Sequence, residues 1–220
     1  MTSEPVELNT LEAKIRACRL CEAYLPLGPR PVFIARSEAR LLIASQAPGR
    51  RVHETGLPFN DPSGDRLRDW LGVDRETFYH HPAIAIAPMG FCYPGTGRGG
   101  DLPPRPECAP AWRRPLLAAM PRVETTVVIG RYALAWHLGL KQGQRLTDLV
   151  ADWRRYAPAQ FPLPHPSPRN NRWLRTNPWF ETEVIPVLQT RVAALLAGDP
   201  EEGSPESNLE GDRTTSPQAP

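Results

Sequence analysis

Long hydrophobic runs are missing from this sequence of 220 residues. No stretch reaches the roughly 18 consecutive apolar residues that a membrane-spanning helix needs, so we expect no membrane span. Residues 1–7 are polar and lack the apolar segment of a secretory signal. The sequence therefore predicts a protein of the cytoplasm.

Lysine is almost absent, because only Lys14 and Lys141 occur among the 26 basic residues. The formal net charge is only +2, which excludes a strongly basic protein that binds anionic polymers over its whole surface. Contacts with such a partner would have to come from local groups of arginine. Arginine suits phosphate and base contacts, although the same bias also follows from GC-rich coding.

Cysteine is scarce as well, and its spacing is informative. The four cysteines are Cys18, Cys21, Cys92 and Cys108, so a C-x2-C pair is followed much later by a C-x15-C pair. Disulfides are rare in the cytoplasm, whereas thiolates so arranged bind zinc or an iron–sulfur cluster. The wide second spacing favours a cluster over zinc, and buried free thiols are the remaining alternative. A cluster here would tie the N-terminal helix to the long loop before Cys108.

Short apolar runs alternate with amphipathic segments, which predicts a parallel sheet covered by helices. We expect a three-layer α/β/α sandwich with a central, mainly parallel four-stranded sheet in one domain, residues 1–197. From residue 198 to residue 220 the chain has little to bury and is predicted to be disordered. The expected strands are 41–44, 83–87, 125–129 and 161–163. The expected helices are 8–17, 63–71 with Ser63 as its cap, 111–120, 130–138, 147–156 and 173–197, the last broken near Pro178 and Pro186.

Polar residues follow three of these strands, in the segments 46–61, 88–108 and 165–171. Loops at the carboxyl ends of parallel strands converge on one crevice, so we expect one active site there. The last segment, His165-Pro166-Ser167-Pro168-Arg169-Asn170, is too rich in proline for a helix or a central strand. It predicts a stiff turn that presents polar groups, rather than a plain surface linker.

Five motifs in this order resemble the uracil-DNA glycosylase superfamily, closest to its iron–sulfur families 4 and 5. The strings are S-Q-A-P-G (45–49), T-G-L-P-F (55–59), D-P-S-G (61–64), H-P-S-P-R-N (165–170) and the four cysteines. The resemblance implies a [4Fe–4S] cluster held by the cysteines, with zinc as the alternative. It also implies a monomer that flips uracil or another deaminated base out of DNA and hydrolyses its N-glycosidic bond.

The resemblance gives each motif residue a role. Phe59 would stack on the flipped base, and His165 would donate a hydrogen bond to the base as it leaves. Asp61 would position water or stabilise the sugar cation, unless it serves only as a helix N-terminal carboxylate. Gln46, which stands where family 4 has an acidic residue, would orient water or bond the base. His53 is a further titratable candidate on the same segment.

The remaining candidates contact the DNA strand. Ala47 of the first motif would bind the substrate, and Ser167 and Arg169 would contact phosphate. Asn170 would also bind substrate, or else Asn170 and Asn171 would cap the following helix. The glycine-rich segment 95–100 is not followed by G-K-[ST], which argues against nucleotide hydrolysis, and we expect a flexible loop facing DNA.

Two alternatives to a glycosylase remain open at this point. Gln46 replaces an acidic residue, and Pro88 stands where other families place an asparagine that reads uracil. These two positions allow a catalytically weak protein of the same fold that only recognises uracil or abasic sites. The other alternative is a small zinc-stabilised α/β protein with no role at DNA.

Overall fold

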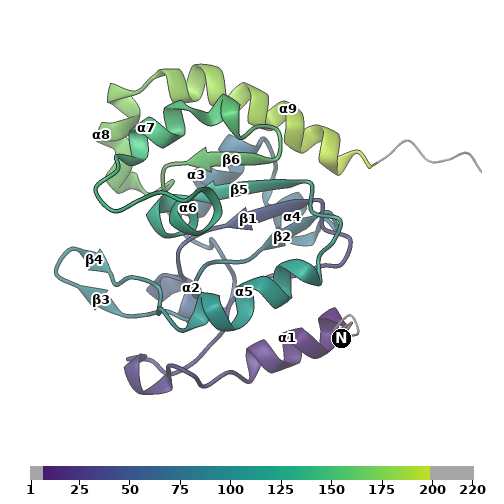
Figure 1. The fold of residues 1–220 in the computed structure, drawn as a ribbon, viewed down its shortest axis with the longest axis vertical. Helices are drawn as coiled ribbons and strands as arrows, with labels where there is room; N and C mark the ends of the chain where they lie inside the picture. The colour runs from purple at the N-terminus through teal and green to yellow at the C-terminus, as the bar shows by residue number, and fades with distance from the viewer. Residues whose placement is uncertain (1–6, 199–220) are drawn as a thin grey trace, which may run out of the picture.

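The structure, a computed structural model, describes residues 7–198 and is built on a four-stranded parallel sheet (Figure 1). The strands are β1 (Leu41–Ala44), β2 (Ile84–Ile86), β5 (Thr125–Ile129) and β6 (Gln160–Leu163), in the order β2-β1-β5-β6. Leu42 lies opposite Ala85 on one side and Thr126 on the other. From β1 the chain first connects to β2 on one side of it, and then returns to β5 on the other side. The loop after β1 therefore lies at the point where the strand order reverses, and α/β sheets bind ligands at such a point.

Helices cover both faces of the sheet, because each strand is apolar on both sides. The helices are α1 (Leu8–Arg16), α2 (Arg50–Thr55), α3 (Pro62–Leu71), α4 (Arg75–His80), α5 (Cys108–Ala118), α6 (Gly130–Leu138), α7 (Leu146–Ala151), α8 (Asn171–Thr176) and α9 (Ile185–Leu196). Leu41 and Ile43 pack with α3, α4 and α9, whereas Leu42 packs with α1 and α5 and Ala44 with α6 and α7. This arrangement confirms the predicted α/β/α sandwich.

Several boundaries differ from those expected. The cap of α3 is Asp61, whose Oδ1 accepts the Gly64 N–H at 2.9 Å, while Ser63 lies inside the first turn. The six-residue helices α2 and α4 were not predicted. The helix expected at 147–156 ends at Ala151, and Trp153–Arg155 forms a separate 3-10 turn. Pro186 causes no break, because it lies in the first turn of α9, where its missing N–H costs no helical hydrogen bond.

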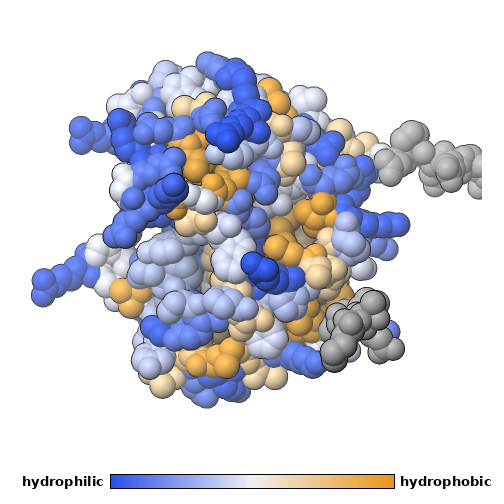
Figure 2. All heavy atoms as spheres, in the orientation of Figure 1, coloured by the Kyte–Doolittle hydropathy of each residue, from blue (hydrophilic) through white to orange (hydrophobic). Residues whose placement is uncertain are grey.

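The glycine-rich segment forms a small hairpin rather than an open loop. Its strands are β3 (Thr96–Gly97) and β4 (Gly100–Asp101), paired antiparallel. In Figure 1 the hairpin extends from the body of the molecule at the edge where the parallel strands end. Figure 2 shows hydrophilic side chains protruding at this place, and Arg98 in the turn is exposed.

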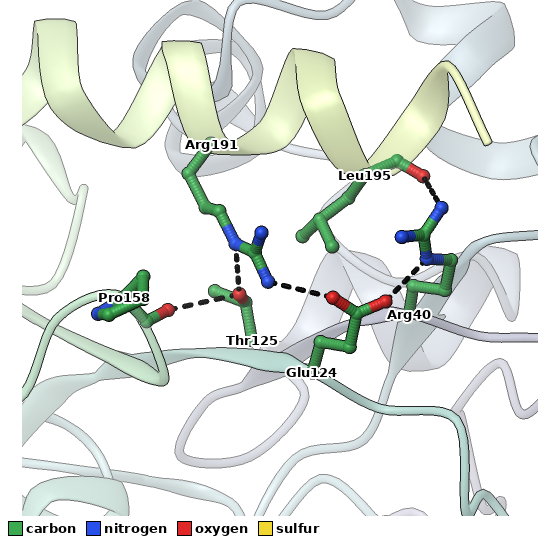
Figure 3. A network of polar contacts seen from close by, with 6 residues as sticks. All are labelled: Arg40, Glu124, Thr125, Pro158, Arg191 and Leu195. Atoms are coloured by element: carbon green, nitrogen blue, oxygen red, sulfur yellow. Dashed lines mark hydrogen bonds and ion pairs between the residues drawn. The ribbon is translucent and has the colours of Figure 1, made fainter. Parts of the chain in front are cut away.

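A polar network fastens α9 to the opposite edge of the sheet, where the strands begin (Figure 3). Glu124 accepts from Arg40 at 2.6 Å and from Arg191 at 2.9 Å. Arg191 also donates to Thr125 Oγ1 at 2.9 Å. The hydrogen bond from Arg40 is the main reason why the pKa of Glu124 is lowered. The network thus stabilises the packing of α9 at the edge where the strands begin, and it lies away from the edge where they end.

Within residues 7–198, no helix combines the length and the apolar character that crossing a bilayer requires. The tail predicted from residue 198 lies, apart from Gly198 itself, outside the described residues.

Candidate active site

A cavity of about 480 Å³ opens at the carboxyl ends of the strands. The segment after β1 contributes Gln46, Ala47, Phe59 and Asp61, the segment after β2 contributes Pro88 and Asp101, and the loop after β6 contributes His165. The predicted site residues Ser167, Arg169 and Asn170 line it too. The structure thus brings together in one crevice eight of the nine residues that the sequence suggested, all except His53.

The geometry of the His165 loop determines which imidazole nitrogen carries the proton. The backbone N–H of Ser167 donates to His165 Nδ1 at 3.2 Å. A neutral ring that accepts at Nδ1 must carry its proton on Nε2, so Nε2–H is a donor. Burial lowers the pKa of His165, against the opposing influence of Asp61 and Asp101, so the ring is held neutral.

Two side chains hold this loop in place. Asn170 donates from Nδ2 to the His165 carbonyl oxygen at 2.7 Å and makes no capping bond to α8. Arg66 of α3 donates to the carbonyl oxygens of Pro166 and Ser167, both at 3.2 Å, and to Asn171 Oδ1 at 2.8 Å. Of the two alternatives for the asparagines, side-chain capping of α8 is therefore not observed: Asn170 is the N-cap residue by position only, and both side chains instead stabilise the turn. Sequence reasoning missed Arg66, because a lone arginine on an amphipathic helix carries no local signal.

Phe59 is held in a strained backbone conformation. Its φ of 54° is the one positive value among the described residues other than glycine. A Cβ on Gly64 would lie 1.7 Å from the Phe59 carbonyl oxygen, so only glycine fits there. The ring is 8% exposed and packs edge-on against Phe78, with centroids 6.2 Å apart. Strain of this kind collects at functional sites, and here it fixes an aromatic ring in the wall of the cavity.

Two carboxylates face the crevice. Asp61 caps α3 through Oδ1, so the structural role that the sequence allowed is real, and the residue lines the cavity as well. Asp101 comes from β4 and accepts from Thr96 Oγ1 at 3.3 Å. No motif in the sequence singles out Asp101, because its place in the cavity depends on the hairpin. Either carboxylate is placed to act on a positive charge that develops in the cavity.

Gln46 forms another part of the cavity wall. A Cβ on Gly130, which has φ +78°, would lie 2.9 Å from the Gln46 carboxamide carbon, so this glycine lets the Gln46 side chain pack over the end of β5. Tyr132 of α6, which was not predicted, lines the same cavity and is 39% exposed. His53 does not line it; it is buried beside Tyr93, with ring centroids 6.1 Å apart.

Arg169 links the His165 loop to the hairpin. It donates to the Gly99 carbonyl oxygen at 3.0 Å, and the side chain is exposed at the rim of the cavity. The Ser167 hydroxyl accepts the Arg169 backbone N–H at 3.3 Å. A guanidinium has five N–H donors, so this contact leaves capacity for an anionic group at the rim.

All four cysteines are free thiols and line one small, mostly apolar space between α1, α5 and the Phe91 segment. Trp112 Nε1–H donates to Cys18 Sγ at 3.3 Å, and the Phe91 N–H donates to Cys108 Sγ at 3.4 Å. Burial raises the pKa of Cys92 to about 11 and that of Cys108 to about 12. Among residues 7–198, no three Cys, His, Asp or Glu side chains are arranged to hold a metal ion. Four thiols with two N–H donors to sulfur are a donor set of the kind that iron–sulfur clusters use.

Arg113 connects this cysteine group to the crevice. It lies on α5, the helix that begins at Cys108, and is 1% exposed. Its Nη1 donates to the carbonyl oxygens of Ala87 and Pro88, and its Nη2 lies 2.7 Å from His137 Nε2. Burial lowers the pKa of His137 to about 3, so His137 is a neutral acceptor. The segment at Pro88, which lines the cavity, is thereby fixed to the helix that carries a cysteine.

The fold and the crevice define an α/β protein whose cavity gathers an aromatic ring, a donor imidazole and two carboxylates. The family model described as "Uracil DNA glycosylase superfamily" matches residues 31–189. The chain therefore belongs to the uracil-DNA glycosylase superfamily, and DNA is the substrate class that this membership implies.

Proposed function

We propose that this protein is a monofunctional glycosylase that flips uracil, or another deaminated base, out of DNA and hydrolyses its N-glycosidic bond. The single observation that carries the proposal is that His165, a neutral ring whose proton is on Nε2, lines the same cavity as Phe59 and Asp61. A target base inside a duplex is out of reach, so it must be extruded into such a cavity.

Each residue then has a chemical task. Phe59 stacks on the extruded base, which is worth ~1–3 kcal/mol. As the bond between the base and C1′ breaks, the bonding electrons go to the base, and His165 Nε2–H stabilises the anion on its oxygen. Asp61 stabilises the positive charge on the sugar and orients the water that attacks C1′. Asp61 accepts the proton that this water loses, and the released base anion takes up one proton from solvent, so that one water is consumed for each free base. Gln46 contacts the polar edge of the base, and Arg169 holds a phosphate at the rim.

The test is incubation of the purified full chain with oligonucleotides that each contain one deaminated base, followed by alkali. With the uracil-containing oligonucleotide we expect abasic sites, which the alkali converts into strand breaks. The rival proposal, a protein that binds but lacks chemistry, is motivated by Gln46 and Pro88 in the cavity wall. It predicts salt-dependent binding to uracil or abasic DNA, with every strand that contains a deaminated base intact after alkali, and that result would remove the enzyme proposal.

We further propose that Cys18, Cys21, Cys92 and Cys108 hold a [4Fe–4S] cluster. When bound, the cluster would act as a covalent tie between the segment at α1 and the segment that carries Cys92 and Cys108. Support comes from the convergence of the four free thiols on one small space between α1, α5 and the Phe91 segment. The N–H donors of Trp112 and Phe91 suit thiolates that bind iron.

This assignment predicts a brown protein when it is purified without oxygen, with about four iron and four sulfide per chain. Cys108→Ser should lose the visible absorbance and melt at a lower temperature, because metal binding and folding are coupled. Ser37→Ala, at a serine outside both sites, serves as the matched control and should keep the colour. A colourless protein with one zinc per chain would establish zinc instead, and a protein without metal would leave free thiols.

A further inference from the structure

A second concave surface adjoins the cavity and has no part in the proposed chemistry. It has a volume of about 560 Å³ and is formed by residues 23–27, which follow Cys21, together with Arg50, residues 93–96 and Leu102. We call it the Tyr24 groove. Its walls carry three large apolar side chains that are well exposed: Tyr24 at 62%, Leu27 at 48% and Leu102 at 46%.

The ring of Tyr24 has one face covered by an arginine, which holds the ring in place. The guanidinium carbon of Arg105 lies 4.2 Å from the ring centroid and covers one face. Arg105 is itself fixed by a forked pair of hydrogen bonds to Glu107, at 2.6 and 3.2 Å. With a cation behind one face and 62% of the residue exposed, the ring offers a flat surface whose orientation is already set.

The groove and the active-site cavity lie next to each other on the surface. Leu102 lines both of them, and Gly49 lines the cavity while the next residue, Arg50, lines the groove. The Arg50 side chain is 72% exposed and pairs with Glu54 at 2.9 Å. Such an exposed pair is weak, so the guanidinium can exchange Glu54 for a phosphate at small cost.

We infer that the Tyr24 groove binds an unpaired base of the same DNA strand, next to or near the nucleotide held in the cavity. An aromatic ring, apolar walls and an arginine at the rim are the features that bind single-stranded nucleic acid. A paired base within a duplex presents no free face, so the groove selects DNA that is single-stranded or locally opened. This inference rests on the proposed function for the presence of DNA at the site.

The experiment uses a fluorescent single strand with an abasic analogue at the position to be flipped. Each flanking base is removed in turn by an abasic spacer, and dissociation constants are measured for the wild type, Tyr24→Ala and Tyr24→Phe. In the wild type and in Tyr24→Phe, removing the base at one flanking position should weaken binding about 5- to 150-fold, the equivalent of ~1–3 kcal/mol per stacked base. In Tyr24→Ala the same removal should have no effect. Trp136→Ala, an aromatic that is 38% exposed on α6 outside both surfaces, should behave as the wild type.

The outcomes separate this inference from the proposed function. If wild type and Tyr24→Ala respond equally to every spacer, or if no spacer weakens binding to the wild type, the groove is not a base site. Release of uracil by the same preparations would show that the glycosylase proposal survives. If the wild type neither binds the strand nor releases uracil, both proposals fail.

Discussion

Replacing His165 by alanine is expected to slow base release by about 10²- to 10³-fold, because one donor aimed at a developing oxyanion is lost. Binding of DNA with a non-cleavable analogue should change far less, since Phe59 and the rim residues remain. Single-turnover kinetics give the rate, and fluorescence anisotropy gives the affinity. His80→Ala on the exposed side of α4 is the matched control and should keep the wild-type rate.

The pH dependence provides a second readout for His165. Burial holds its pKa below the ordinary histidine value of about 6.5. Because the folded protein binds the His165 proton less readily than the unfolded chain, the neutral ring adds to the free energy of unfolding. This contribution is complete above the unfolded-state pKa of about 6.5 and is lost as the pH falls through the lower pKa of the folded state. Protonation would also turn Nδ1 into a donor that faces the Ser167 N–H. We expect the wild-type rate to fall on the acid side and this step to be missing in His165→Ala. Equal rates for the wild type and His165→Ala at neutral pH would exclude His165 as the donor.

Gly64→Ala is expected to destabilise the protein and impair base release, although glycine-to-alanine changes within helices usually stabilise by about 1 kcal/mol. The added Cβ would lie 1.7 Å from the Phe59 carbonyl oxygen, so residues 59–64 must move. Overpacking of this kind costs about 1–3 kcal/mol or more, which lowers the melting temperature by several degrees. Because the shift displaces the stacking ring, the rate should fall by at least about tenfold, the equivalent of ~1.4 kcal/mol.

Gly99→Ala is the control for this change, because Gly99 has open space at its Cβ position and no positive φ. It should melt and react as the wild type does. If Gly64→Ala matched Gly99→Ala in both stability and rate, then the tight contact at Phe59 would have no role in holding the site together.

The sequence predicted the framework well wherever the signal was local. The strand at 125–129 and the helix at 130–138 have the predicted bounds, because a short apolar run defines the strand and Gly130 directly after it opens the helix. The helices α2 and α4 were missed, since six residues are too few for a periodic pattern to emerge. Asp61, Pro62 and Ser63 are all residues typical of a helix start, so the sequence alone does not decide between Asp61 and Ser63 as the cap of α3. The hydrogen bond from the Gly64 N–H to the Asp61 carboxylate identifies Asp61.

The candidate site was predictable to the extent that its residues lie in motifs. His165, Phe59, Asp61 and Gln46 were found in this way, and the structure places all four around one cavity. Arg66, Asp101 and Tyr132 were not, because each reaches the site through tertiary packing and stands alone in the sequence. Arg113 is a further example, since its hydrogen bonds to the Ala87 and Pro88 carbonyl oxygens depend on how α5 packs against the end of β2.

The central claim is that these residues release one free base from DNA by hydrolysis. Its most direct test is mass spectrometry of the reaction of the full chain with uracil-containing DNA, alongside His165→Ala. We predict free uracil equal in amount to the alkali-labile sites, with strands intact before alkali and release much slower in the variant. Absence of free base from every deaminated substrate, with DNA binding retained, would contradict the claim.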